Sequence, residues 1–322
     1  MNFYKLFFGI NFCCLQIISR VIKSFQGSTT MKIFEFLISS LRLTVLTCLI
    51  FGSGQASAGD RLLATGGVIQ LEGAGGGGLN PWALITGYGT DEQIGLSANY
   101  AKARTNGGYE IDSGGFGVGF YNRFELSVNQ TKFGLNNTVP HESIEMDTVG
   151  VKLRILGDAV YDQDNWIPQV AVGVQYKKNE DFNLVPKLVG GQHSSGIDFY
   201  LSATKLYLGA IYGRNLLLNA NLQATKANQF GLLGFGGDKH DSYSINPAFS
   251  AALMLNDNLF IGAEYRTKPN NIKTLKEDDA KDLFLTWFPS KNLSITSAYI
   301  DLGNIANKNN QTAWYLSGQI SY

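Results

Sequence analysis

The feature that most constrains this chain is an alternation of apolar and polar residues that runs through most of the sequence after Gly59. In RNLLLNANLQATK (214–226), leucine and alanine hold the even positions from 216, whereas asparagine, glutamine and threonine hold the odd positions from 219. Successive side chains of a β-strand point to opposite faces, so this pattern predicts strands with one apolar and one polar face. Helical periodicity is scarce by comparison.

The alternation divides the chain into fourteen predicted strands, most of them about ten residues long. About ten residues is also the length that a tilted strand needs to cross a lipid bilayer. The predicted strands are 62–72, 82–89, 93–104, 114–121, 124–133, 147–157, 166–177, 196–207, 214–225, 243–255, 258–267, 280–288, 292–301 and 313–322.

The predicted connections alternate between short and long along the chain. The short ones are 90–92, 122–123, 158–165, 256–257 and 289–291, and the long ones are 134–146, 178–195, 226–242, 268–279 and 302–312. Transmembrane barrels have short turns on the periplasmic side and long loops outside. A soluble sandwich has no reason to alternate so regularly, and an even strand number places both termini in the periplasm.

Lipid offers no hydrogen-bond partners to an open sheet edge, so strands that cross a bilayer must close into a barrel. The expected fold is therefore all-β, a transmembrane antiparallel β-barrel of about 14 strands that spans 59–322. The alternative is a barrel of 12 strands with an N-terminal plug.

The segment 31–58 has the features of a cleaved secretory signal peptide. Lys32 and Arg42 supply positive charge, 43–51 is an apolar core, and Ala56-Ser57-Ala58 fits an A-x-A cleavage site. Because Met31 is the better start, we interpret 1–30 as an extra or untranslated segment. All three cysteines precede residue 59, which excludes a thiolate nucleophile or a zinc–cysteine site in the body.

Charge and motifs nominate no cofactor, metal or catalytic group. Residues 1–58 contain five basic residues and one acidic residue of a chain with 26 of each, so the body is mildly acidic and nucleic-acid binding is not expected. The three histidines fall in predicted long loops without a second histidine at ligand spacing. DQDN (162–165) lacks the glycine of a calcium loop, and the contiguous letters of HES (141–143) cannot face each other as a catalytic triad requires.

Charged residues of both signs fall on the predicted inward faces. Such residues either form a constriction that selects ions or pair with each other and fill the lumen. A wide ring of strands needs a channel or a plug, and both readings stay open. The predicted lumen-lining residues are Glu125, Lys152, Arg154, Asp198, Glu264 and Arg266.

EGAGGGGLNPW (72–82) matches the glycine spacing of a dinucleotide-binding loop. That site needs a helix directly after the glycines, but Asn80-Pro81-Trp82 and the following residues predict a turn and a strand. We interpret the run as a hairpin tip or as a segment tucked into the lumen, where missing side chains allow close backbone approach. Its members are Gly73, Gly75, Gly76, Gly77 and Gly78.

Several stretches resemble a proteobacterial family of outer-membrane proteins known only as a domain of unknown function. They are 71–90, 149–178, 224–241, 262–271 and 298–306, which together sample nearly the whole body. The resemblance implies an outer-membrane barrel and no reaction. The final Tyr322 also resembles the C-terminal signal that the barrel-assembly machinery of Gram-negative bacteria recognises.

Three functional hypotheses follow. The first is a porin-like channel or transporter for small solutes. The second is a closed barrel with a structural, adhesive or receptor role through its outer loops, and the third is a membrane-embedded hydrolase, for which the sequence nominates no nucleophile. The expected surroundings are outer-membrane lipid and lipopolysaccharide, reached through the periplasm.

Overall fold

A computed structural model describes residues 59–322, except 137–138, 140 and 306–307. The predicted signal segment 31–58 and the preceding 1–30 lie outside the described residues. Within the described part, no helix has the length and apolar character needed to cross a membrane.

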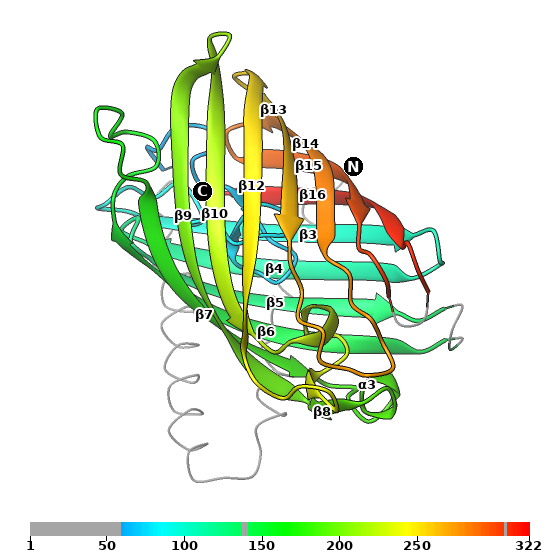
Figure 1. Cartoon of the computed structure of the whole chain (residues 1–322). Coiled ribbons are helices and arrows are strands. Elements are labelled where there is room, and N and C mark those ends of the chain that lie inside the picture. The colour runs from blue at the N-terminus through cyan, green and yellow to red at the C-terminus, as the bar shows by residue number, and fades with distance from the viewer. Residues whose placement is uncertain (1–58, 137–138, 140, 306–307) are drawn as a thin grey trace, which may run out of the picture. The chain divides into compact units, whose positions relative to one another are not determined.

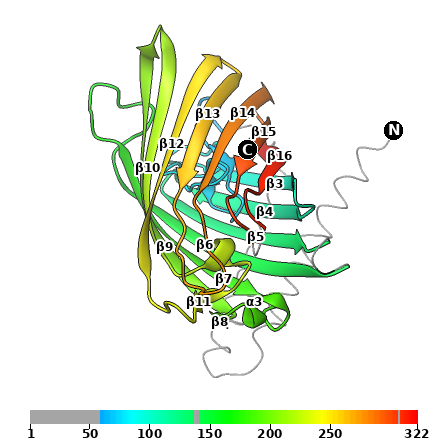
Figure 2. The same cartoon turned by 45° about the vertical axis from the view of Figure 1, so that its right-hand side comes forward.

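Twelve antiparallel strands form one closed barrel (Figures 1 and 2). Chain neighbours pair along the whole ring, and β16 pairs with β3 to close it, with Ile320 opposite Ala98. The strands are β3 (Ile94–Thr105), β4 (Glu110–Phe120), β5 (Phe124–Gly134), β6 (Ser143–Leu156), β7 (Gln169–Asn179), β9 (Ser195–Ile211), β10 (Arg214–Thr225), β12 (Ser244–Asn256), β13 (Leu259–Arg266), β14 (Ala280–Ser290), β15 (Leu293–Asp301) and β16 (Thr312–Ser321).

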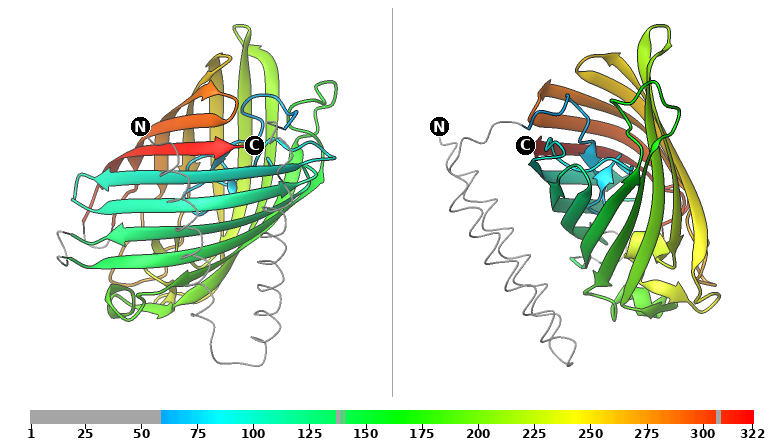
Figure 3. Two further views of the ribbon diagram at one scale, coloured as in Figure 1. Left: turned by 180° about the vertical axis from the view of Figure 1, so that it is seen from behind. Right: turned by 90° about the vertical axis from the view of Figure 1, so that its left-hand side faces the viewer.

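The prediction of fourteen wall strands is wrong at the N-terminus, and the alternative of twelve strands with an N-terminal plug is confirmed. The predicted strands 62–72 and 82–89 do not join the wall. They belong to a segment, 60–90, that the barrel encloses and that we call the plug (blue in Figure 3). Its only strands are the two-residue β1 (Val68–Ile69) and β2 (Gly75–Gly76), which pair with each other. The alternation predicted continuous strands here, but the backbone of 62–72 and 82–89 consists mainly of turns and bends, and glycines and Pro81 prevent a continuous ladder.

The connections give the barrel two distinct ends. One end, the long-loop end, carries 106–109, 135–142, 180–194, 226–243, 267–279 and 302–311, and the other, the short-turn end, carries 121–123, 157–168, 212–213, 257–258 and 291–292. The long loops contain a helical turn, α3 (Val185–Leu188), a 3-10 turn, η1 (Asn228–Gly231), and a small sheet of β8 (Gly191–His193) with β11 (Phe235–Gly237).

The two faces of the wall have opposite chemistry. Large apolar side chains are exposed on the outside, for example Phe249, Leu283 and Leu316 at 53%, 58% and 59%. The inward face is buried and largely polar, because the period-two alternation places serine, threonine, asparagine, glutamine and charged residues there, with some apolar side chains such as Phe260 and Phe284 among them. These inward side chains meet the plug, so the candidate site is the filled lumen.

Candidate functional site

The plug backbone hydrogen-bonds partly to itself and partly to side chains of the wall. Inside the plug, the Gln70 N–H donates to the Ala74 carbonyl at 2.8 Å, and the Leu71 N–H donates to Gly78 at 3.0 Å. The wall supplies acceptors for further plug N–H groups: Gln319 for Ile69 at 2.6 Å and Thr204 for Ala83 at 2.8 Å. A buried backbone group needs such a partner, so these contacts fix the path of the plug.

Glu125 and Lys152 form the first anchor, from neighbouring strands β5 and β6. Their side chains are each 1% exposed and lie 3.1 Å apart. Glu125 accepts the N–H groups of Gly75 and Thr86, both at 2.9 Å. Lys152 Nζ donates to the carbonyls of Gly75 and Leu84, at 2.6 and 2.9 Å. This ion pair therefore binds plug backbone through both of its partners.

Glu264, on β13, forms the second anchor. Its carboxylate accepts the Leu79 N–H at 2.6 Å, the Ser250 hydroxyl at 2.7 Å and the Trp82 indole N–H at 3.4 Å. Asp282 on β14 lies beside it and accepts the Glu264 backbone N–H at 3.1 Å. Within the described residues, no cationic side chain forms an ion pair with either carboxyl group.

The third anchor is a chain of four buried charges that crosses the lumen. Arg266 on β13 pairs with Glu72 of the plug, and Glu72 pairs in turn with Lys177 on β7. Lys177 also lies 2.5 Å from Asp198 on β9. Glu72, Lys177 and Asp198 are at most 1% exposed, so this chain lies wholly inside the barrel.

The six predicted lumen residues thus occupy different places. Glu125, Lys152, Asp198, Glu264 and Arg266 are buried on inward faces, and each has partners within the anchors described above. Arg154 instead lies half-buried at the short-turn end, where its guanidinium contacts the Gly157 carbonyl at 2.7 Å and Asp158 at 3.0 Å. Tyr322 lies at the same end, and its carbonyl accepts the N–H groups of Tyr88 and Leu96 at 2.9 and 2.8 Å.

Two members of the glycine run show why this segment has no side chains. Gly73 has a φ of +95°, and a β-carbon there would lie 2.6 Å from the Asn129 β-carbon. A β-carbon on Gly77 would lie 2.7 Å from the Glu264 Cδ atom. The run therefore allows plug backbone to approach wall side chains at van der Waals contact.

Much of the seam between plug and wall is polar. Among the described residues, several buried polar atoms along this seam have no hydrogen-bond partner in the protein. The atoms are Gln70 Oε1, Asn80 Oδ1, Thr86 Oγ1, Gln175 Oε1, Asn219 Nδ2 and Asn221 Oδ1.

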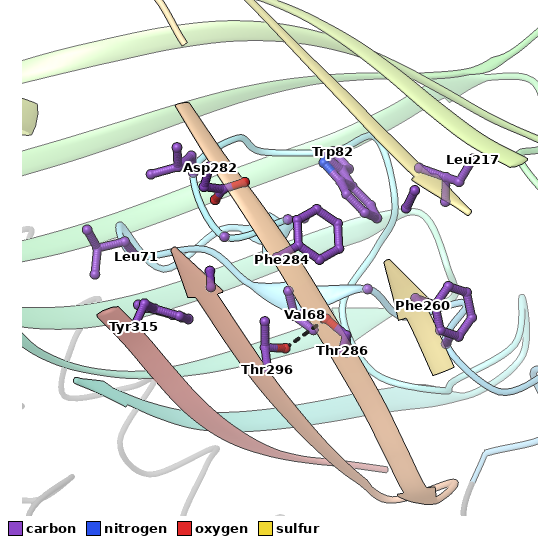
Figure 4. Close-up of a pocket in the computed structure, with 18 of the residues that line it drawn as sticks. Val68, Leu71, Trp82, Leu217, Phe260, Asp282, Phe284, Thr286, Thr296 and Tyr315 are labelled. Carbon is purple, nitrogen blue, oxygen red and sulfur yellow. Dashed lines mark hydrogen bonds between the residues drawn. The ribbon is translucent and has the colours of Figure 1, made fainter. Parts of the chain in front are cut away.

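A small cavity of about 50 Å³ lies between the plug and strands β10 and β12 to β16 (Figure 4). Its walls are mostly apolar and include Leu71, Trp82, Phe260 and Phe284, with Asp282 among the few polar groups. Thr286 and Thr296 also face it and hydrogen-bond to each other at 3.0 Å.

Loop 226–243 covers the third anchor at the long-loop end. Phe230 lies over the Arg266 guanidinium, with 4.7 Å between the ring centroid and Cζ, and over Lys268 Nζ at 5.5 Å. Glu277 accepts the Gln229 N–H at 2.8 Å and lies 3.7 Å from Lys268 Nζ. Burial raises the pKa of Glu277 to about 7, although the Lys268 ammonium acts in the opposite direction. Burial also lowers the pKa of Lys268.

Among the described residues, the loop histidines and the acidic side chains do not come together as a metal site. No group of three histidine, cysteine, aspartate or glutamate residues among them has the geometry to hold a metal ion. His193 and Asp241 pair at 2.9 Å in the exposed loops, and Asp241 also binds Lys226 at 3.0 Å. In the part of the chain that the structure describes, none of the hydrogen bonds joins His193 to a serine, threonine or cysteine.

Sequence reasoning missed three residues of the lumen. Lys177 follows the inward-facing Gln175 by two positions, so the alternation itself could have indicated it. Asp282 also falls on an inward position of its strand. Glu72 carried no comparable signal, because its role depends on the plug lying inside the barrel.

The family comparison covers most of the chain. Residues 65–319 match the family described as "Protein of unknown function (DUF3034)". No curated protein matches the chain.

Solved structures of similar fold include porins and a lipase. The KdgM porin is 13% identical, covering 70% of this chain and 99% of its own, with a TM-score of 0.45. The NanC porin is 11% identical, covering 69% of this chain and 98% of its own, with a TM-score of 0.47. Outer membrane phospholipase A from Escherichia coli is 11% identical, covering 69% of this chain and 92% of its own, with a TM-score of 0.40.

Proposed function

Because the chain belongs to the DUF3034 family and folds as a closed barrel with a filled lumen, we propose that it is an outer-membrane channel for small solutes, closed by its own N-terminal plug. The long-loop end then faces outward and the short-turn end faces the periplasm. The segment 31–58 would direct export, and Tyr322 would serve the assembly machinery.

The outer surface supports a lipid environment. Exposed apolar side chains surround the wall, which would be an aggregation hazard in water but suits a bilayer. Aromatic rings lie toward both ends of the strands, such as Trp287 near the short-turn end and the Tyr299–Trp314 pair near the long-loop end, with ring centroids 5.1 Å apart. Amphipathic rings favour the interfaces of a membrane, where lipopolysaccharide and phospholipid headgroups would surround them.

The observation that carries the proposal is the large polar and charged share of the plug–wall seam, which lies beside a smaller apolar contact around Leu71 and Trp82. A permanent plug would be held best by apolar packing, because buried ion pairs gain little over apolar groups of similar volume. An apolar lumen would also stay dry once the plug had moved. The inward glutamines, asparagines and charged residues would instead hydrate, so the seam fits a plug that leaves and a lumen that then conducts.

A second candidate is a permanently closed barrel with a structural or receptor role through its loops. It is favoured by the three buried anchors, which together fill the lumen in the described state. A membrane-embedded hydrolase receives no such support, because His193 lacks a nucleophile within hydrogen-bond distance among the described residues.

A disulfide between plug and wall separates the two candidates. A β-carbon built on Gly117 of β4 lies 3.6 Å from the Thr86 Cβ atom of the plug, within the usual 3.5–4.5 Å of a disulfide. The full-chain variant T86C/G117C is compared with the wild type in planar bilayers. We expect single-channel openings from the reduced variant and none from the oxidised variant, with full recovery after reduction.

The controls locate the cause of any change. Each single-cysteine variant should conduct equally with and without oxidant. Equal currents from the oxidised and reduced double variant would refute gating by the plug. Silence of the wild type and of the reduced variant at every voltage would favour the permanently closed barrel.

A further inference from the structure

Glu72 is the only plug residue whose carboxylate bridges two cations of the wall among the described ion pairs. One carboxylate oxygen pairs with Lys177 and the other with Arg266. The two cations belong to β7 and β13, which are separated in the barrel ring by β9, β10 and β12. The carboxylate therefore lies between two parts of the wall rather than against one strand.

The wall contacts of Glu72 would change unequally if the plug left. Lys177 would keep Asp198 at 2.5 Å, because both residues belong to the wall. Arg266 would lose both Glu72 and the Leu79 carbonyl, which it contacts at 2.8 Å, and would keep only the Phe230 ring. The wall would then hold two cations against one carboxylate at this position.

The arrangement suits an anion with two acceptor oxygens. An arginine guanidinium and a lysine ammonium on opposite sides of one carboxylate make two charge-assisted hydrogen bonds, the strong class of such bonds. The Gln70 side chain adds a third donor to Glu72 at 2.6 Å, but it is part of the plug and would leave with it. The two wall cations would therefore recognise the carboxylate group of a solute and would not specify the rest of the solute molecule.

The site also lies toward the end from which an external solute would arrive. Lys177 is near the long-loop end of β7, and Arg266 ends β13. Phe230 covers Arg266, and Gln229 and Phe230 have φ values of 47° and 63°. Two consecutive non-glycine residues in the left-handed region are costly, and such strain often marks a functional loop.

From these contacts we infer that Lys177 and Arg266 form a carboxylate-binding site for the transported solute and that Glu72 occupies it as an internal substitute in the closed state. This inference rests on the proposed function and names its substrate class, small carboxylates. A solute carboxylate that reaches Lys177 and Arg266 competes with Glu72 and shifts the population toward the open barrel. A ligand shifts the equilibrium between the closed and the open barrel only if it binds the open state better. Here it would do so because Glu72 leaves the site when the barrel opens.

The test uses the full chain in planar bilayers with malonate added on the long-loop side, against chloride at equal ionic strength. Malonate should raise the open probability of the wild type. Without malonate, the open probability of E72Q should be at least roughly tenfold higher than that of the wild type. The variant lacks the buried carboxylate that pairs with Lys177 and Arg266. E72D, which keeps the carboxylate, should remain closer to the wild type.

The wall variants separate binding from plug release. R266Q should lose the response to malonate, whereas R266K should keep part of it because it retains the cation. The matched control is K281Q, which removes an exposed cation that pairs with Asp301 at 3.3 Å near the same end of the barrel. K281Q should respond like the wild type. A full malonate response in R266Q, or an unchanged baseline in E72Q, would overturn the site.

A second readout does not depend on conduction. In the T86C/G117C background, malonate should slow disulfide formation, because it favours the state in which the plug has left the wall. Slower cross-linking without any current would support the site and count against the channel. Currents that respond to plug locking, together with cross-linking that is insensitive to malonate, would support the channel and overturn the site.

Discussion

The Glu264 carboxylate on β13 occupies the space that a side chain on Gly77 of the plug would need. A β-carbon on Gly77 would lie 2.7 Å from Glu264 Cδ, closer than real β-carbons approach. Because Glu264 also accepts the Leu79 N–H at 2.6 Å, it cannot move without loosening the plug. We therefore expect G77A to weaken plug docking by about 1–3 kcal/mol, the usual cost of overpacking.

The neighbouring glycine provides the matched control. A β-carbon on Gly78 would lie 3.4 Å from Glu264 Oε2 and 3.7 Å from Asp282 Oδ2, which are ordinary contacts. Limited proteolysis in detergent should cleave the plug of G77A sooner than that of G78A or the wild type. Equal cleavage rates for the two alanine variants would contradict the steric role assigned to Gly77.

Removal of the Lys152 ammonium should destabilise the plugged barrel strongly. K152M leaves Glu125 buried without its cation and leaves the Gly75 and Leu84 carbonyls without their donor. Breaking a buried pair in this way costs about 3–5 kcal/mol. Urea unfolding in detergent, followed by heat-modifiable gel migration, should show the loss.

The double variant K152M/E125Q tests the reason for that loss. It removes the uncompensated charge, so it should recover much of the stability that K152M loses. If the double variant is no more stable than K152M, the lost hydrogen bonds to the plug carbonyls dominate over the unpaired charge of Glu125.

The wall could be predicted from the sequence because its physical rule is local. Each of the twelve wall strands overlaps a predicted strand, and β10 (Arg214–Thr225) has the predicted bounds. The same rule failed for 62–72 and 82–89, because it could not show that Gln319 and Thr204, rather than a neighbouring strand, accept the N–H groups of Ile69 and Ala83. These partners are 250 and 121 residues away in sequence, so no local pattern encodes them.

Docking of loop 226–243 should depend on pH through Glu277. The pKa of this carboxyl is raised from 4.5 to about 7, so the folded state binds its proton more tightly than the unfolded state does. The stabilisation is fully present below pH 4.5 and is lost as the pH rises through about 7. Hydrogen exchange of the Gln229 amide, corrected for its intrinsic rate, should show greater protection at pH 5 than at pH 8.

The variant E277Q tests this assignment. Its amide side chain does not titrate in this range, yet it can still accept the Gln229 N–H. Protection of the Gln229 amide in E277Q should therefore be nearly equal at pH 5 and pH 8. A pH effect of the same size in E277Q as in the wild type would assign it to another group.

The outward face of β14 offers a direct test that the barrel lies in lipid. Leu283 is 58% exposed, lies within β14 and stands opposite Tyr299 of β15. An arginine on the lipid face costs about 2–4 kcal/mol near the bilayer midplane and about 0–1 kcal/mol near the interfaces. Leu283 lies toward the long-loop end of β14, between midplane and interface, so L283R should lower the free energy of unfolding in phospholipid vesicles, measured by urea titration, by about 1–2 kcal/mol, between these two ranges. The control K281R keeps a cation near the long-loop end of the same strand and should leave the stability unchanged. A water-soluble wild-type barrel, or an L283R variant as stable as K281R in vesicles, would show that this face does not contact lipid.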